Sequence, residues 1–256
     1  SNGNIWIGTA ADGLIRYRNG VFSFLTEKEG LSGNIIRSIT EDREGNLWVG
    51  TALGGVNCLR GGTFVTFGRR EGLCDDVVFS VYEDRRRQLW IGTNSGLNLF
   101  RGGKYYHFTT ADGLADNVVT SISEDSKGFT WICTDKGLNR LHCAGAKILK
   151  VDTYLENEYV LAFHEDKAGN RWAGTLAGLY KKGAAPAAHD RGVFVRQEGL
   201  SSSVINFIYE DSRGSLWFST LRKGLTRCKD GAFTLFDSES GLINNNVNCI
   251  YEDGES

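Results

Sequence analysis

Residues 41–51 read EDREGNLWVGT, and the chain repeats this phrase along its length. Its tryptophan recurs at intervals of 42, 42, 41, 41 and 45 residues, as Trp6, Trp48, Trp90, Trp131, Trp172 and Trp217. A Glu-Asp pair precedes every tryptophan but the first, and one more pair stands near the C-terminus; the aspartates are Asp42, Asp84, Asp125, Asp166, Asp211 and Asp253. A fixed period of about 40 residues is typical of solenoids and propellers.

Each unit reads as four short strands separated by turns. We expect a first strand such as 118–122, a tryptophan strand such as 89–93, then strands such as 97–100 and 105–108. The Asp-x-x-Gly between the first two strands is a turn signal, because Asp bonds the local backbone and Gly supplies positive φ. No stretch shows a helical apolar period. The sequence therefore predicts an all-β fold, a six-bladed β-propeller of four-stranded antiparallel blades.

The two ends of the chain complement each other in this pattern. The chain opens on a tryptophan strand and finishes on Val247–Tyr251, which reads as the first strand of a unit. We predict that Val247–Tyr251 pairs antiparallel with Ile5–Thr9 and closes a single domain over residues 1–256, with about 42 residues per repeat. The alternative is that the chain is part of a larger propeller, for example a seven-bladed one.

Composition excludes several functional classes. The chain has 256 residues, a formal net charge of −2 and no methionine. A nucleic-acid-binding domain needs a basic stripe, and no signal peptide or membrane-spanning apolar run is present. We expect no nucleic-acid partner, and membrane attachment only through segments outside this chain. The missing methionine indicates a piece excised from a longer protein.

The cysteines and histidines show no metal-binding pattern. The six cysteines form no CxxC motif, and the four histidines form no HxH or HExxH motif. We therefore expect mostly free thiols that act as small apolar fillers, with no metal and no cofactor.

The repeated carboxylates and tryptophans have both a functional and a structural interpretation. Glycosidases use paired carboxylates, and a tryptophan could stack on a sugar. However, a residue that recurs at the same place in every unit is more simply part of the scaffold. We predict that the aspartates hold turns, that the tryptophans pack between blades, and that the chain has no catalytic residue and is not an enzyme.

Positions that differ among the units, while their neighbours stay alike, are the candidates for ligand binding. Five residues before each Asp stand Arg37, Phe79, Thr120, Leu161, Asn206 and Asn248. Polar side chains precede them in the entering loop, namely Asn34, Asp76, Asn117, Glu158 and Asn245. The loops after the tryptophan strands add Asp12, Lys136 and Arg222. We predict that these groups, Leu161 excepted, line a central funnel and bind a hydroxyl-rich small molecule.

The consensus V-x-S-I-x-E-D-x-x-G-N-x-W-x-G-T-x-x-G-L-x-R resembles the two-component regulator propeller repeat over essentially the whole chain. The resemblance implies an extracytoplasmic, periplasmic sensor region of a bacterial inner-membrane signalling protein, placed before a membrane span and an output module. It also implies recognition of a ligand, often a carbohydrate, without catalysis. The chain departs from the pattern at Thr153–Glu156, where the loop Gly-Leu is missing, and at an insertion around Ala184–Ala188.

The leading hypothesis is thus a signal-transduction sensor domain that binds a glycan or small molecule. A protein–protein interaction platform, including self-association as a homodimer, is the alternative; it predicts a large exposed apolar patch. A sialidase-like hydrolase or a lyase is the third reading, and it predicts a cluster of groups with perturbed pKa values.

Overall fold

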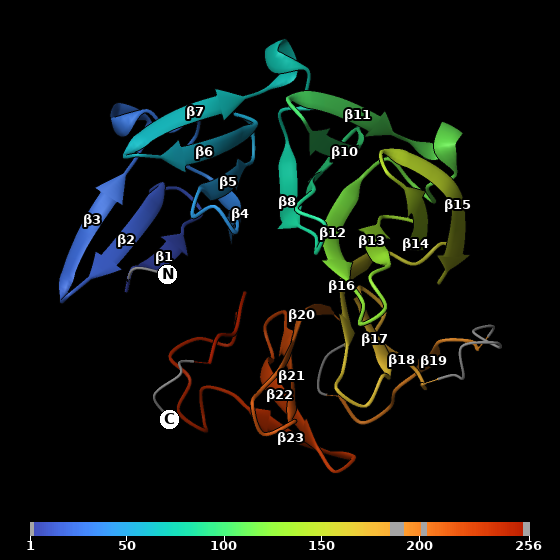
Figure 1. The fold of residues 1–256 in the computed structure, drawn as a ribbon. Coiled ribbons are helices and arrows are strands. Elements are labelled where there is room, and N and C mark those ends of the chain that lie inside the picture. Colours follow the sequence, from blue (N-terminus) through green and yellow to red (C-terminus); the bar gives the residue numbers. More distant parts are fainter. Residues whose placement is uncertain (1–2, 185–191, 201–203, 253–256) are drawn as a thin grey trace. The chain divides into compact units, whose positions relative to one another are not determined.

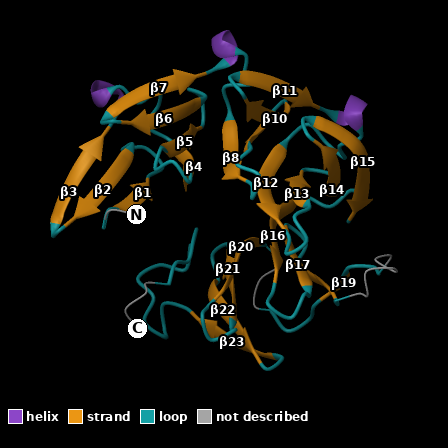
Figure 2. Cartoon of the chain, viewed as in Figure 1, coloured by secondary structure: helices purple, strands orange, loops and turns teal. Residues whose placement is uncertain are grey.

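The computed structural model describes residues 3–184, 192–200 and 204–252, and their regular structure is almost entirely β (Figures 1 and 2). The first sheet holds β1 (Ile5–Gly8), β2 (Leu14–Arg18) and β3 (Val21–Leu25). The second holds β4 (Ile36–Glu41), β5 (Leu47–Thr51), β6 (Val56–Arg60) and β7 (Thr63–Phe67). The third holds β8 (Val78–Glu83), β9 (Leu89–Thr93), β10 (Gly96–Arg101) and β11 (Lys104–Phe108).

Three further sheets follow in the second half of the chain. The fourth holds β12 (Val119–Glu124), β13 (Thr130–Thr134), β14 (Gly137–Ala144) and β15 (Lys147–Tyr154). The fifth holds β16 (Val160–Glu165), β17 (Arg171–Thr175), β18 (Leu179–Lys182) and β19 (Val195–Arg196). The sixth holds β20 (Ile205–Glu210), β21 (Leu216–Thr220), β22 (Gly224–Lys229) and β23 (Ala232–Phe236). The prediction of an all-β fold made of six propeller blades is confirmed.

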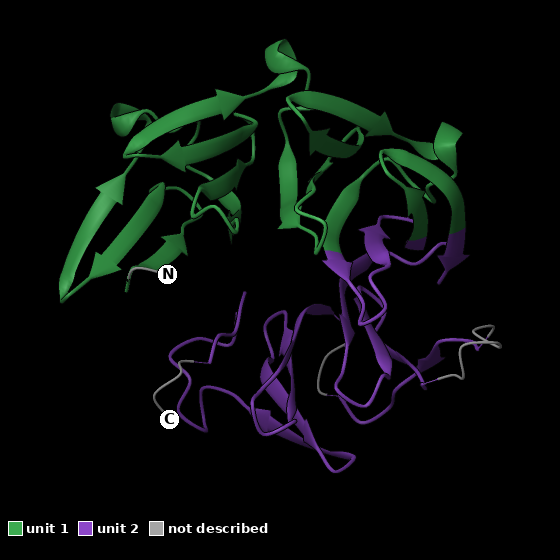
Figure 3. Ribbon diagram, in the orientation of Figure 1, with its two compact units in different colours: residues 1–122, 141–151 green, residues 123–140, 152–256 purple. Residues whose placement is uncertain are grey.

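The chain separates into two compact units, each described here by itself (Figure 3). Unit 1 comprises Ser1–Ile122 and Leu141–Val151, and unit 2 comprises Ser123–Arg140 and Asp152–Ser256. The expectation of a single domain over residues 1–256 stays a prediction. The insertion around Ala184–Ala188 falls, beyond Ala184, outside the described residues, as does Asp253.

One part of the fold prediction is wrong. Val247–Tyr251 is not a strand, and the first sheet has three strands where four were expected. The segment contacts the last blade instead, since Asn206 Nδ2 donates to the Val247 carbonyl at 3.2 Å. Just before it, the Gly224 N–H donates to the Asn245 carbonyl at 2.9 Å. A strand requires a ladder of paired backbone groups, and side-chain and single backbone contacts of this kind do not supply one.

Each blade is built around the strand that carries the tryptophan. In the third blade this strand, β9, pairs with β8 on one side and β10 on the other, with Tyr82 and Leu99 opposite Trp90. The threonine that ends the strand closes the next turn, since Thr93 Oγ1 donates to the Gly96 carbonyl at 2.8 Å. Thr9, Thr51, Thr134, Thr175 and Thr220 make the corresponding bond in the other blades. This bond accounts for the recurring Gly-Thr and the Gly that follows it.

The aspartate of each Glu-Asp pair ties the turn to the tryptophan. Asp84 Oδ2 accepts from Trp90 Nε1 at 2.9 Å, while Asp84 Oδ1 accepts the backbone N–H groups of Arg86 and Gln88 at 2.8 and 2.9 Å. The indole bond recurs at 2.7–2.9 Å in the pairs Asp42–Trp48, Asp125–Trp131, Asp166–Trp172 and Asp211–Trp217. The prediction that these aspartates hold turns is confirmed. One carboxylate also satisfies the polar atom of a largely buried indole.

These hydrogen bonds favour the charged carboxylate. Burial alone would raise the pKa of Asp42, but hydrogen bonds from Trp48, from the Asn46 side chain and from backbone N–H groups outweigh it and lower the pKa below 3.8. The pKa of Asp211 is lowered in the same way, by Trp217 and Ser215 against the opposing effect of burial.

Trp48, Trp131 and Trp172 pack against the next blade. Trp48 lies in one cluster with Val78 and Val81 of β8 and with Leu89 and Ile91 of β9. Trp131 stacks on Phe163 of β16 with ring centroids 4.3 Å apart. The blades approach closely: a Cβ added at Gly92 would lie 2.6 Å from Val119 Cγ1. The core of these blades therefore lies between neighbouring sheets.

We expect Trp90→Ala to lower the free energy of unfolding by about 3–5 kcal/mol, because Trp90 is 1% exposed and its loss leaves a cavity. Leu53, 77% exposed, is the matched control, and Leu53→Ala should change stability by less than about 0.5 kcal/mol. Chemical denaturation measures both. Equal midpoints for Trp90→Ala and the unmodified protein would contradict the inferred packing.

The lowered aspartate pKa values predict how stability depends on pH. A carboxylate whose pKa is lower in the folded state stabilises the fold above its unfolded value, and this contribution is lost as pH falls through the folded value. The melting temperature should therefore fall steadily below about pH 4. Asp42→Asn should melt lower than the unmodified protein at pH 7 and lose less on acidification. If the melting temperatures of Asp42→Asn and of the unmodified protein fell in parallel between pH 7 and pH 2, the Asp42 carboxylate would not contribute to the pH dependence of stability.

Candidate functional site

The variable residue five positions before each aspartate lies at a break in the strand pairing in four of the blades. The pairing of the first strand with the tryptophan strand shifts register between Ile36 and Ser38, which leaves Arg37 unpaired. The same shift skips Phe79, Leu161 and Asn206 in their blades. A β-bulge places one extra residue in a strand and re-aims its side chain. The residues that differ most among the blades are thus those least constrained by the sheet.

The bulge and the loop after the tryptophan strand lie at the same end of the blade in four of the blades. Ile36 is paired with Thr51, and the Ala52 N–H donates to the Ile35 carbonyl at 3.0 Å. The neighbouring Leu53 is 77% exposed. In the blades of β8, β16 and β20, the backbone N–H groups of Asn94, Leu176 and Leu221 make the equivalent bond.

Four of the polar loop residues hold the scaffold. Asn34 Oδ1 accepts the Glu27 N–H at 3.1 Å, and the Asn34 carbonyl accepts the Gly13 N–H at 2.9 Å. The side-chain oxygens of Asp76, Asn117 and Asn245 accept the equivalent bond from the backbone N–H groups of Arg69, Thr110 and Ser238. Three of these bonds begin the 3-10 turns η1 (Glu27–Glu29), η2 (Arg69–Glu71) and η3 (Thr110–Asp112), and each of these turns ends on a glycine of positive φ. That these residues also contact a ligand stays a prediction.

Glu158 belongs to a blade that departs from the repeat. Its Oε1 accepts from the Tyr180 hydroxyl at 3.0 Å, and the positive φ of the missing glycine is taken by Leu155 and Asn157, at 50° and 66°. No 3-10 turn forms in this loop.

The other predicted residues differ in how free their side chains are. Arg37, Asp12, Lys136 and Arg222 are exposed, and Phe79 and Thr120 are half-buried. Asn206 is engaged, since it accepts from Ser219 Oγ at 3.0 Å and donates to the Val247 carbonyl. Asn248 is exposed in the segment after the last blade. Each unit contributes some of these residues: Asp12, Arg37, Phe79 and Thr120 belong to unit 1, and Lys136, Asn206, Arg222 and Asn248 to unit 2.

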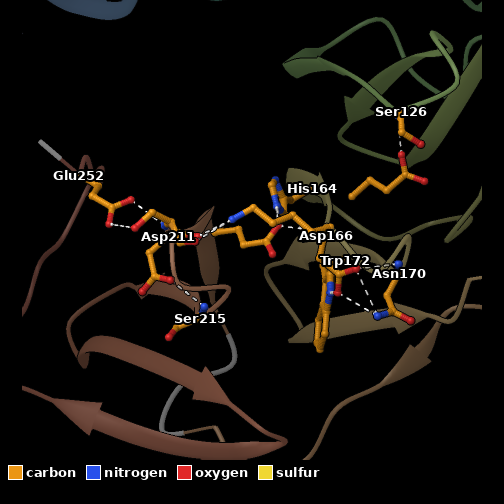
Figure 4. Close-up of polar contacts among 12 residues, drawn as sticks. Ser126, His164, Asp166, Asn170, Trp172, Asp211, Ser215 and Glu252 are labelled. Carbon is orange, nitrogen blue, oxygen red and sulfur yellow. Dashed lines mark hydrogen bonds and ion pairs between the residues drawn. The ribbon is translucent and has the colours of Figure 1, made fainter. Parts of the chain in front are cut away.

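The glutamates of four Glu-Asp pairs have a structural role that the sequence did not reveal (Figure 4). Glu210 Oε2 accepts the Lys167 N–H of the preceding blade at 2.9 Å. The same contact joins Glu83 to Arg43, Glu165 to Ser126 and Glu252 to Ser212, at 3.1, 2.5 and 2.7 Å. We call these contacts the glutamate latches. In each of these four pairs the donor is the residue directly after the aspartate of the preceding blade. This constant spacing is the signal in the sequence from which the contact could have been predicted.

The latches leave few carboxylates for acid–base chemistry. One oxygen of Glu210 also lies 3.4 Å from His164 Nε2, and Arg171 contacts Asp125 at 3.6 Å and Glu165 at 3.7 Å. Each carboxylate of these Glu-Asp pairs therefore already holds a turn, an indole or a neighbouring blade. Within the described residues, no three His, Cys, Asp or Glu side chains are grouped to hold a metal ion.

We expect Glu210→Ala to lower the free energy of unfolding by about 1–3 kcal/mol, because it removes the acceptor of the Lys167 N–H. Glu44→Ala is the matched control, since Glu44 is an exposed carboxylate on a blade turn. Thermal melting measures both variants. The latch would have no energetic role if the two variants melted together.

Known proteins share both the repeats and the fold. The family model described as "Two component regulator propeller" matches residues 30–52, 72–95, 113–136 and 199–222. No curated protein matches the chain in sequence. No helix in the described part of the chain has the length and apolar character needed to cross a membrane.

Three solved structures illustrate the likeness. The extracellular domain of a protein assigned as a hybrid two-component system of B. thetaiotaomicron is 20% identical, with a TM-score of 0.68 over 99% of this chain and 41% of that one. PorZ, a surface component of the type-IX secretion system of Porphyromonas gingivalis, is 15% identical, with a TM-score of 0.77 over 97% and 42%. Virginiamycin B lyase of Staphylococcus aureus is 11% identical, with a TM-score of 0.72 over 92% and 81%.

At these identities the structures show the fold alone, and this chain spans less than half the length of the first two. The family model matches four of the repeats, at the positions where the sequence carries its consensus. The resemblance noted in the sequence is therefore confirmed at these four repeats, which are two-component regulator propeller repeats.

Proposed function

We propose that this chain is the ligand-binding sensor region of an extracytoplasmic bacterial signalling protein. Its repeats are those of the two-component regulator propeller family. Two structures of similar fold are extracellular domains of proteins assigned as two-component and one-component systems. These likenesses support the placement outside the cytoplasm and the role in signalling.

The observation that carries ligand binding is that equivalent bulged positions carry different side chains, within unit 1 and within unit 2 taken separately. A scaffold built from repeats has no structural need for different side chains at equivalent positions. At the bulge, nevertheless, a cation, a ring, an aliphatic chain and an amide replace one another as Arg37, Phe79, Leu161 and Asn206. Such variety is what recognition of an asymmetric molecule requires.

The chemistry of unit 1 narrows the class of ligand. Arg37 on β4 is exposed, and Phe79 is half-buried on the neighbouring strand β8. A guanidinium recognises a carboxylate or phosphate through paired hydrogen bonds, and an aromatic ring packs on the apolar face of a sugar. We infer a small molecule that carries both an acidic group and an apolar face, such as a sugar acid.

Catalysis is the weaker reading. The similar lyase fold includes a catalytically inactive histidine-to-alanine variant. Here the His107 ring contacts Asn98 at 2.8 Å and the His164 ring contacts Glu210 at 3.4 Å, so both serve the scaffold. We infer binding without turnover. The interaction-platform reading is favoured by exposed Leu53, Leu176 and Leu221 at the bulge end.

A thermal-shift screen of sugar acids and neutral glycans tests this proposal. A ligand should raise the melting temperature and return unchanged by chromatography. Arg37→Ala should weaken the binding of an acidic ligand about tenfold or more, because a hydrogen bond to a charged group contributes ~1.5–3 kcal/mol. Arg60→Ala, which removes an exposed arginine at the end of β6, should leave binding unchanged. Equal affinities of the two variants would reject the site, and product formation would reject the sensor reading.

A further inference from the structure

The turn between β8 and β9 breaks the pattern of its sister turns. Its sequence is Asp84-Arg85-Arg86-Arg87, and Arg87 adopts a φ of 60°. The corresponding residue in the other turns is a glycine of similar φ: Gly45 at 83°, Gly128 at 79°, Gly169 at 80° and Gly214 at 77°. Positive φ is unfavourable for a residue with a Cβ and is neutral for glycine.

Arg87 makes only the backbone hydrogen bond that a glycine makes in the sister turns. The Arg87 N–H donates to the Asp84 carbonyl at 3.0 Å, as the Gly45 N–H donates to the Asp42 carbonyl at 2.9 Å. Asp84 holds Arg86, Gln88 and Trp90 as its counterparts do in the other blades. The turn would therefore form at least as well with glycine, and a strained residue with no structural return indicates a functional one.

The tip also carries exposed positive charge. Arg85, Arg86 and Arg87 are all exposed, and the side chains of Arg86 and Arg87 have no hydrogen-bond or ion-pair partner among the described residues. Arg43 lies beside them, since its guanidinium donates to the Arg85 carbonyl at 2.9 Å. The neighbouring carboxylates are already engaged: Asp84 is buried on its indole, and Glu83 is latched to Arg43.

We propose that this arginine tip, residues 85–87, docks an acidic segment of a protein partner. Guanidinium groups match carboxylates as paired donors, which a lysine does not do. A hairpin tip presents its charges at an exposed point, which an acidic segment of a partner can reach without a groove. The tip lies at the opposite end of β8 from Phe79, so docking and ligand binding use separate surfaces of that blade.

Binding of a fluorescent ten-residue polyglutamate peptide, followed by anisotropy at low and at physiological salt, tests the proposal. The unmodified protein should bind, and added salt should weaken the binding. Arg87→Gly should weaken binding severalfold yet raise the melting temperature by about 2–4 °C, because glycine relieves the strain. Arg86→Ala should weaken binding without that rise. Arg213→Ala removes one exposed charge from the equivalent turn before β21 and should leave binding unchanged.

Three results would overturn the proposal. The unmodified protein could fail to bind the peptide, Arg87→Gly could melt lower, or Arg213→Ala could weaken binding as much as Arg86→Ala. Anionic phospholipid vesicles and a heparin fragment serve as competing probes; their binding through Arg86 and Arg87 in place of the peptide would also reject a protein partner. Arg37→Ala should leave peptide binding intact, so that failure here is distinguishable from failure of the sensor proposal.

Discussion

The hydrogen bond from each tryptophan indole to the aspartate six residues before it is the contact on which the rest of the structure depends. The same carboxylate accepts the backbone of its turn, so one side chain shapes the hairpin, orients the ring and satisfies its polar atom. The ring can then pack on the next blade with its nitrogen satisfied. Because the glutamate beside the aspartate latches the preceding turn, a single dipeptide links three functions of the repeat.

The repeated scaffold concentrates freedom at a few positions. Tryptophan, threonine, glycine and the acidic pair are all committed to packing or hydrogen bonds within or between blades. The bulged residue of the first strand is released from the backbone ladder, which skips it, and Arg37 at this position is exposed. Even the polar loop residues nearby cap turns, as Asn34 and Asp76 do. Ligand recognition in such a fold therefore depends on the irregular positions of an otherwise regular sheet.

Much of the fold could be predicted from the sequence, and less of the candidate site. The tryptophan period, the Asp-x-x-Gly turn and the β-branched first strand predicted the blades. The strand 89–93 was predicted with its observed bounds. The variable position was also found by comparing units, but its bulge was not, because a register shift leaves no local mark in the sequence. The pairing of Val247–Tyr251 was predicted wrongly, since a strand pattern shows the capacity to pair and not the presence of a partner.

What the sequence determined by itself was the repeat, the strands and the turns, because these follow from propensity and spacing within about ten residues. It also revealed the likeness of the repeats to the two-component regulator propeller, whose model matches four of them. What only the tertiary structure decided was the contact between residues some 30 to 40 positions apart, such as the latch of Glu210 on Lys167 and the packing of Trp48 on β8. These contacts depend on how one blade meets its neighbour, which is not encoded in a local pattern of residues.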